Sequence, residues 1–299
     1  MLVANTAGSG RNFMAINATF CGLGAILLWS TLAFLTTLSG KAPPFQLVAM
    51  TFAIGAAVGA FSRLFRRGPG GSLRQPLKVW LLGVGGLFGY HSAYFAALQL
   101  APATEASLIN YLWPLLIVLF SGLLPGERLR AAHIAGALCG LFGVIILIGG
   151  SGSLTFSGSH LYGYGFALLA AIIWAGYSVL SRLLGAVPTD AVTGFCLATS
   201  LLSLACHLAF ETTVWPQGSQ WFAVAALGAG PLGVSFYLWD IGIKRGNIQR
   251  IGVLSYATPV LSTLLLVVTG NGKPTWQLAL SCLLIVTGAM IATFWRRRE

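Results

Sequence analysis

The chain has 299 residues, of which 57% are hydrophobic and only 8% are charged, and its mean hydropathy is +0.84. An ordinary soluble domain carries roughly 25% charged residues, so a water-facing surface cannot be built from this composition. A soluble enzyme, a nucleic-acid-binding protein and a disordered protein are therefore excluded. The long apolar runs indicate transmembrane helices rather than the short alternating strands of an outer-membrane barrel.

The formal net charge of +11 does not point to nucleic acid, because Lys and Arg collect on the cytoplasmic loops of membrane proteins. The five cysteines are Cys21, Cys139, Cys196, Cys206 and Cys282. All of them fall inside apolar runs and none forms a CxxC pair, so neither a disulfide framework nor a zinc site is indicated. We expect no metal, no other cofactor and no nucleic-acid partner.

Apolar runs of about 20 residues, the length that crosses a bilayer core, recur along the chain. They predict ten transmembrane helices, at residues 15–39, 43–63, 76–100, 103–124, 129–149, 160–184, 188–210, 219–242, 248–270 and 274–295. No connection is long enough for a soluble domain, so any activity must lie among the helices. Residues 1–14 are expected to form a flexible cytoplasmic N-terminus and residues 296–299 a basic cytoplasmic C-terminus.

The basic residues predict the orientation of these helices. With ten spans both chain ends lie on one side, and all 17 basic residues except Lys41 and Lys273 then fall on that side. Positive charge marks the cytoplasmic side of a membrane protein. We therefore expect a protein of the inner membrane with both termini in the cytoplasm.

The sequence matches itself at a shift of 145 positions. Matched pairs include Trp29 with Trp174, Pro43 with Pro188, Tyr111 with Tyr256, Pro114 with Pro259, and Gly143 with Gly288. Two repeats are predicted, residues 15–150 and 160–295, with five helices each. An odd number of spans turns the second repeat upside down, and inverted repeats around a central cavity are the architecture of alternating-access transporters.

The two halves resemble the EamA-type repeats of the ten-helix drug/metabolite transporter superfamily. The shared features are the first-helix Trp29 and Trp174, the fourth-helix Pro114 and Pro259, and the Gly126–Glu127 pair after helix 4. Within that superfamily, GYHSAY at 89–94 and NYLWP at 110–114 are similar to the YddG-type aromatic amino acid exporters. The second half departs from the pattern, because Asn271–Gly272 stands where Gly–Glu is expected. Glu127 is therefore interpreted as a loop or helix-cap residue.

Charged side chains are almost absent from mid-membrane depth, where each costs at least about 2.5 kcal/mol on insertion scales. Glu105 begins helix 4 near the outer surface, and Asp240 lies four residues before Lys244, which predicts a helix-end ion pair. A cation exporter needs a buried acid and a phosphate carrier needs buried Lys or Arg. The substrate is therefore expected to be neutral or zwitterionic.

Aromatic and small polar residues take the place of charges at this depth. The candidate substrate-binding residues are Trp29, Tyr90, His91, Tyr94, Asn110, Tyr111, Trp113, Trp174, Tyr177, Ser178, Trp239, Ser255 and Tyr256. The rings would stack on an aromatic substrate or attract its ammonium group. His91, Asn110, Ser178 and Ser255 would hold the polar end, while His91 could equally be a neutral packing residue or a proton-responsive gate.

Pro114 and Pro259 are predicted hinges, because each removes the hydrogen bond to the carbonyl four residues back, at Asn110 and Ser255. Those carbonyls could accept a substrate ammonium group. The alternative is a tolerated kink. Gly136, Gly140 and Gly143 predict a close helix-packing face.

The favoured hypothesis is an inner-membrane exporter of amino acids, preferably Phe, Trp and Tyr, with Met and Thr as further candidates. One alternative is export of other neutral metabolites or drugs. Another is an intramembrane enzyme or lipid-handling protein, but His91, His133, His160 and His207 show no HxxxH or HExxH spacing. Facilitated diffusion and proton antiport both remain open, as does the oligomeric state, for which a monomer is compatible with the sequence.

Overall fold

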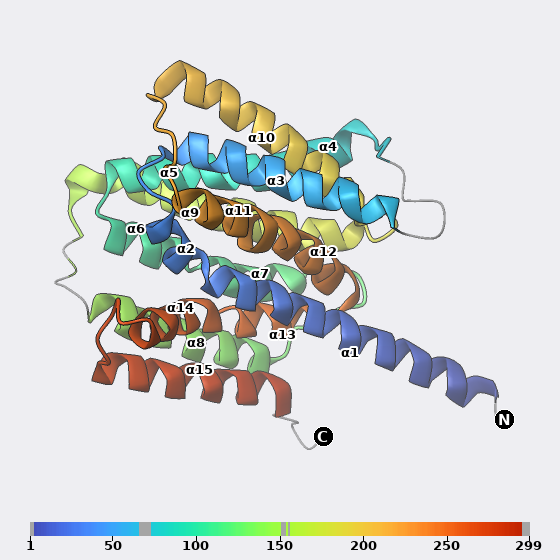
Figure 1. Cartoon of the computed structure of the whole chain (residues 1–299). Helices are drawn as coiled ribbons and strands as arrows, with labels where there is room; N and C mark the ends of the chain where they lie inside the picture. Colours follow the sequence, from blue (N-terminus) through green and yellow to red (C-terminus); the bar gives the residue numbers. More distant parts are fainter. Residues whose placement is uncertain (1–2, 66–72, 151–153, 155, 295–299) are drawn as a thin grey trace.

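The computed structural model describes residues 3–65, 73–150, 154 and 156–294, and over these residues the chain is helical without strands. Ten stretches are long and apolar enough to cross a membrane, as the sequence predicts. Each boundary lies within three residues of its predicted position. The protein is an all-α polytopic membrane protein whose helices run roughly along one direction (Figure 1).

The first five spans are built from eight helices. They are α1 (Val3–Ser30), α2 (Leu32–Leu38), α3 (Pro44–Leu64), α4 (Leu77–Val84), α5 (Tyr90–Leu100), α6 (Ala103–Asn110), α7 (Trp113–Ser121) and α8 (Ala131–Gly149). Helix α1 extends beyond the predicted span to Val3 and projects from the bundle (Figure 1). Flexibility of residues 1–14 stays a prediction, and residues 295–299 lie outside the described part.

The last five spans contain seven helices. They are α9 (Leu161–Leu183), α10 (Ala191–Phe210), α11 (Gln220–Ala229), α12 (Ser235–Arg245), α13 (Ile248–Leu254), α14 (Ala257–Val268) and α15 (Trp276–Phe294). A short 3₁₀ turn, Gly158–His160, precedes α9.

Four spans are interrupted in ways that the repeat explains. A π-helical turn, Gly85–Gly89, joins α4 to α5, and a second, Gly230–Val234, joins α11 to α12 at the shift of 145 positions. Two-residue turns at 111–112 and 255–256 likewise break the spans that contain Pro114 and Pro259. π-helical turns are rare and occur mostly where a helix serves a function.

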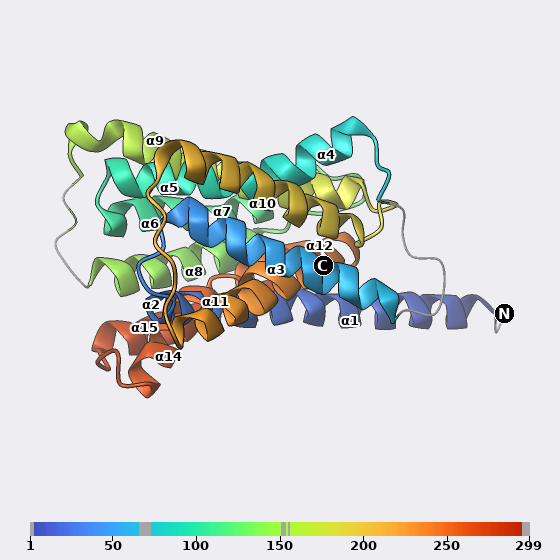
Figure 2. The ribbon, with the colours of Figure 1, turned by 45° about the horizontal axis from the view of Figure 1, so that its top comes forward.

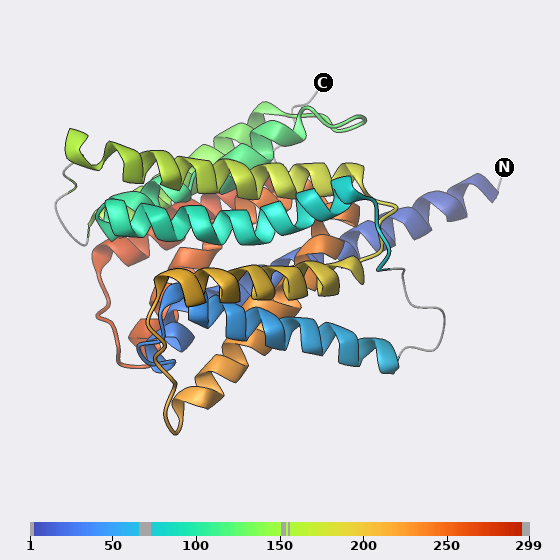
Figure 3. The same ribbon diagram turned by 90° about the horizontal axis from the view of Figure 1, so that it is seen from above.

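The main contacts between the two repeats are made by pairs of helices, one from each repeat. Helix α3 lies along its repeat counterpart α10, and α8 along its counterpart α15. Figure 2 and Figure 3 show α3 and α10 side by side over most of their length. In the centre, α1 packs on α12 of the other repeat, while α9 packs on α5. This reciprocal pattern is the one that two inverted halves around a central axis produce.

The α8–α15 pair confirms the predicted close packing of the glycine face. A Cβ atom on Gly136 would lie 2.5 Å from the carbonyl oxygen of Gly288, so only glycine fits at this crossing. Ser281 Oγ donates a hydrogen bond to the Gly143 carbonyl at 2.7 Å. The pair therefore forms a closely packed outer stave of the bundle.

Candidate functional site

A cavity of about 220 Å³ lies between the two repeats. Its wall consists of Trp29, Leu32, Ala33, Tyr90, His91, Tyr94, Asn110, Tyr111, Trp113, Trp174, Leu232, Phe236, Thr258 and Ser262. Eight of these were candidate substrate-binding residues from the sequence: Trp29, Tyr90, His91, Tyr94, Asn110, Tyr111, Trp113 and Trp174. Residues from both halves of the chain thus meet around one central space.

Indole rings form one side of this cavity. The ring centroids of Trp29 and Trp174 lie 5.5 Å apart, and Trp113 meets them edge-on at 6.3 and 6.4 Å. Tyr90 reaches Trp174 at 5.4 Å. Edge-to-face and tilted pairs at such distances are the favourable arrangements of aromatic rings, so the cluster holds its shape without a ligand.

The polar groups of the wall come from the helices around the first-half interruptions. Asn110 Nδ2 donates to the hydroxyl oxygen of Tyr90 at 3.1 Å, and the hydroxyl groups of Tyr94 and Ser107 are hydrogen-bonded at 2.9 Å. The Oδ1 atom of Asn110 and the hydroxyl of Thr258 are buried and have no hydrogen-bond partner among the described residues. Buried polar atoms without partners are costly, which is typical of a site that a polar ligand completes.

His91 is fixed by its own helix. Its Nδ1 lies 2.7 Å from the Leu87 carbonyl oxygen, which can only accept, so Nδ1 carries the proton and Nε2 is left as an acceptor in the neutral ring. The ring meets Phe52 and Tyr90 edge-on, both at 5.2 Å. His91 is thus placed as an uncharged polar group against an aromatic wall.

Five candidate residues lie behind the wall rather than in it. They are Tyr177, Ser178, Trp239, Ser255 and Tyr256, all at most 3% exposed. Trp239 Nε1 donates to Ser178 Oγ at 3.1 Å, and Trp239 stacks on Trp174 at 6.0 Å. A substrate contact by these five residues stays a prediction for another conformation of the protein.

The helix is interrupted just before Pro114 and just before Pro259, which is the position that the hinge hypothesis predicts for a break. The Ser255 carbonyl already accepts a hydrogen bond from Thr258 N at 3.1 Å. It is therefore less open to a substrate ammonium group than the sequence alone suggests. Bending at either proline stays a prediction.

Six wall residues were not selected from the sequence: Leu32, Ala33, Leu232, Phe236, Thr258 and Ser262. Thr258 and Ser262 are spaced i, i+4 and so share one face of α14. The i, i+4 spacing of these two polar residues could have indicated a cavity-facing side of this span. The turn at 255–256 changes the direction in which the side chains after it point, so a single regular helix through the whole span does not predict which side faces the cavity.

The cavity continues toward the end of the bundle opposite the chain termini. A second hollow of about 530 Å³ shares Ala33, Tyr94, Tyr111 and Ser262 with the first. Its far wall includes Thr104, Lys273 and Gln277, which lie at the ends of helices on that side. The central cavity thus adjoins a vestibule on that side.

Polar bonds within and between the repeats cross the other end of the bundle. The guanidinium group of Arg182, in the second repeat, forms an ion pair with Glu127 of the first repeat, and within its own repeat it donates to the carbonyls of Ile243 at 2.6 Å and Gly246 at 2.8 Å. Gln249 Nε2 donates to the other Glu127 oxygen at 2.9 Å. Glu127 lies in a loop, as expected, but it also closes this end of the bundle.

The predicted helix-end ion pair of Asp240 lies beside this closure. Lys244 Nζ is 2.8 Å from Asp240 Oδ1, and Thr189 Oγ1 donates to Asp240 Oδ2 at 2.7 Å. Asp240 is thus fully occupied with structural partners. The wall of the central cavity contains no Asp, Glu, Lys or Arg among the described residues.

Ten spans in two inverted five-span repeats, with a central cavity that opens toward one end, define a membrane transporter. The sequence model of the EamA-like transporter family matches the chain twice, at residues 16–149 and 161–294. The protein belongs to this family. Ancestry therefore agrees with the internal repeat and with the fold.

Several similar proteins are named for the export of aromatic amino acids. The aromatic amino acid exporter YddG of Ancylobacter novellus is 58% identical over 284 residues, which are 94% of this chain and 99% of that protein. The protein of the same name from Escherichia coli strain K12 is 28% identical over 298 residues, with 94% and 98% of the two chains covered. A solved crystal structure with 58% sequence identity matches with a TM-score of 0.90, covering 93% of this chain and 96% of that chain.

Proposed function

We propose that the protein exports aromatic amino acids, Phe, Trp and Tyr, through the central cavity by alternating access. The observation that carries this proposal is a ligand-sized cavity whose described wall contains Trp and Tyr rings and no charged side chain. Indole and phenol faces bind both a flat aromatic side chain and an ammonium group. The relatives named aromatic amino acid exporters support the same substrate class.

The two ends of an amino acid would meet different parts of the wall. Its aromatic side chain would lie among Trp29, Trp113 and Trp174, and its charged groups near His91 and Asn110. Asn110 Oδ1 is an acceptor for the ammonium group, while the hydroxyl of Thr258 can donate to the carboxylate. A zwitterion brings both charges, so the wall needs neither an acid nor a base.

The direction of transport follows from the proposed orientation. The excess of positive residues at the terminus-bearing end supports a cytoplasmic location of that end. The cavity then opens outward, and the Glu127–Arg182 pair closes it from the inside. This is the conformation from which an exporter releases its substrate, and an inward-open state of the same two repeats would load it.

A counterflow assay in proteoliposomes tests this proposal. Liposomes preloaded with unlabelled phenylalanine should accumulate labelled Phe, Trp or Tyr well above protein-free liposomes, with Met and Thr measured alongside. The matched variant is Trp174→Ala, which removes the central ring and should abolish the signal while the protein stays folded. Absence of counterflow for every amino acid would reject the substrate class, and a panel of neutral metabolites and drugs would then test the alternative.

The same proteoliposomes test which energy source drives transport. Facilitated diffusion predicts that an imposed pH gradient leaves the net flux of phenylalanine unchanged. Proton antiport through His91 predicts that the gradient drives accumulation and that His91→Gln abolishes this response but not counterflow. A monomer would suffice in either case, because one chain supplies the entire wall.

A further inference from the structure

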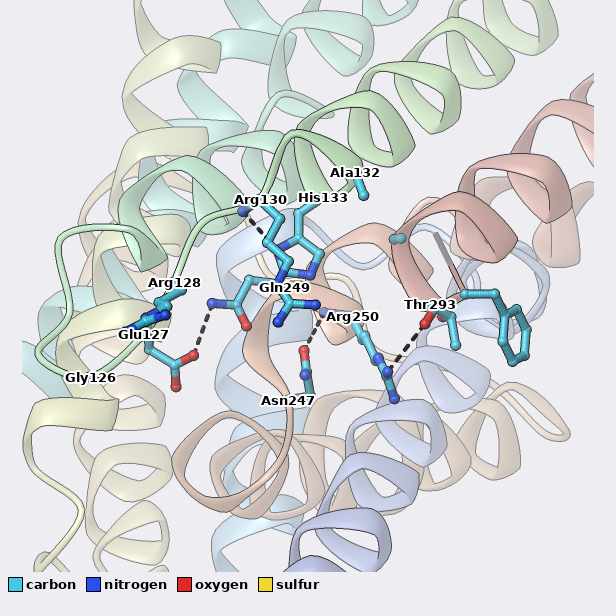
Figure 4. A pocket seen from close by; sticks show the side chains of 12 residues that line it. Gly126, Glu127, Arg128, Arg130, Ala132, His133, Asn247, Gln249, Arg250 and Thr293 are labelled. Carbon is cyan, nitrogen blue, oxygen red and sulfur yellow. Dashed lines mark hydrogen bonds between the residues drawn. The ribbon is translucent and has the colours of Figure 1, made fainter. Parts of the chain in front are cut away.

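A further cavity, separate from the central substrate cavity, lies at the terminus-bearing end of the bundle. It measures about 690 Å³ and lies between the loop before α8, the start of α13 and the end of α15 (Figure 4). It is lined by Gly126, Glu127, Arg128, Arg130, Ala132, His133, Asn247, Gln249, Arg250, Ala292, Thr293 and Phe294. Neither the cavity nor its lining is part of the substrate site.

Positive charge dominates this cavity. Arg128, Arg130 and Arg250 line it together with His133, and among the described residues of the lining Glu127 is the only acid. The Glu127 carboxylate is already shared between Arg182 and Gln249. The lining therefore carries an excess of positive charge that its own acid does not neutralise.

The guanidinium groups are available to a ligand to different degrees. Arg250 Nη2 donates to the Thr293 carbonyl at 3.3 Å, which uses only one of its five N–H bonds. For the side chains of Arg128 and Arg130, the described part of the chain offers no hydrogen-bond or ion-pair partner. Like charges that line one hollow repel one another, and an anion bound between them would reduce this repulsion.

The repeat shows that the fold itself does not require these charges. At the shift of 145 positions, Arg128 corresponds to another basic residue, Lys273, but Arg130 corresponds to Thr275, His133 to Leu278 and Arg250 to Glu105. The same helices thus pack at the other end of the bundle with one basic residue in place of the cluster. Helix packing alone therefore does not account for Arg130, His133 and Arg250.

We propose that this cavity binds the phosphate group of an anionic lipid of the adjoining membrane leaflet. Arginine forks match phosphate oxygens in pairs, and basic pockets between transmembrane helices are recurrent sites for anionic headgroups. Arg128 and Arg130 come from the first repeat and Arg250 from the second, so the phosphate would bridge the two halves.

The surroundings favour a lipid over a free phosphate ion. Phe294 at the rim is 77% exposed, and the outward faces of α8 and α15 carry Phe142 and Met290, which are 59% and 50% exposed. These apolar surfaces lead along the membrane from the cavity and can receive acyl chains. A free phosphate ion would make no use of them.

Binding is tested on the purified full-length protein in a non-ionic detergent. Native mass spectrometry would count bound phosphatidylglycerol, phosphatidylcholine and inorganic phosphate in separate titrations. The double variant Arg128→Gln/Arg130→Gln is compared with Lys78→Gln/Arg245→Gln, which removes two exposed basic residues from the same end but outside the cavity. A third variant, Arg128→Lys/Arg130→Lys, keeps the charge.

We expect phosphatidylglycerol to bind and phosphatidylcholine to bind far more weakly. At the usual contribution of a basic side chain near an anionic headgroup, loss of two arginines should weaken binding roughly thirtyfold. The control pair should change it little, and the lysine variant should retain most of it. The two glutamine double variants should have the same melting temperature as the parent protein in lipid-free detergent. This measurement separates lost binding from lost folding.

Two results would overturn the proposal: no preference for the anionic lipid, or an equal loss in the control pair, which would show attraction by general surface charge. Inorganic phosphate that binds as tightly and displaces the lipid would establish a phosphate site with a soluble ligand and remove the lipid assignment. A transport assay does not enter this test, so its outcome is independent of the proposed substrate.

Discussion

Removing the guanidinium group of Arg182 should shift the protein toward the state that is open at the terminus-bearing end. Arg182 pairs with Glu127 of the first repeat and donates to two carbonyls of its own repeat, those of Ile243 and Gly246, at 2.6 and 2.8 Å, so this one side chain ties together three segments at this end. Hydrogen bonds to a charged group contribute about 1.5–3 kcal/mol each. Because both partners of the ion pair are about one-fifth exposed, solvent weakens the pair, and we take about 2 kcal/mol for the whole set.

A change of about 2 kcal/mol alters an equilibrium constant roughly thirtyfold. The assay is the labelling rate of Ser178→Cys by a membrane-impermeant maleimide applied from the terminus-bearing side, in a background without the five native cysteines. Ser178 is fully buried in the present structure, so labelling requires opening. Arg182→Gln should raise this rate by one to one and a half orders of magnitude, and Glu127→Gln by less.

Arg245→Gln, which removes an exposed basic residue at the same end, is the control and should leave the labelling rate unchanged. If Arg182→Gln labels no faster than the parent while its melting temperature shows a folded protein, the contacts do not hold this end closed. A parallel rise in the control would show that surface charge, rather than the bridge between repeats, controls access.

Three further changes test the packing and the site. Asn110→Ala removes the donor to Tyr90 and an unpaired acceptor, and should raise the KM for phenylalanine about tenfold, as one hydrogen bond of about 1.5 kcal/mol implies, in initial-rate measurements. Gly136→Ala places a Cβ 2.5 Å from a backbone oxygen and should destabilise the protein by about 1–3 kcal/mol, whereas Gly165→Ala, with nothing within 4 Å, should not lower the melting temperature. Gly176→Ala, also without a steric neighbour, should slow counterflow of phenylalanine severalfold without destabilising the protein, and an unchanged rate would argue against bending at this position.

The spans were predictable because the bilayer imposes one length and one composition on every helix that crosses it. The repeat was predictable because Trp29, Pro114 and their counterparts keep a constant spacing of 145 positions. The π-helical turns were not predicted, although Gly85 and Gly230 are matched glycines in the repeat and mark the starts of both turns.

The site was predicted better in the first repeat than in the second. Asn110, Tyr111 and Trp113 all line the cavity, whereas of their counterparts Ser255, Tyr256 and Thr258 only Thr258 does so. A one-residue change of register turns a helical side chain by about 100°, so small differences at the turn move a residue from cavity to packing. Tyr256 packs against α8, where a Cβ on Gly140 would lie 2.5 Å from its ring.

The differences between the two halves are what a transporter with inverted repeats requires. The first span breaks at Thr31, but its counterpart α9 runs unbroken through Gly176, the matching position. Glu127 closes one end, whereas Gly272, its counterpart, brings no acid to the open end. If both halves had the same shape, the cavity would be equally open or closed at both ends. One half must therefore be bent where the other is straight, and an exchange of these two shapes would carry the opening from one side of the membrane to the other.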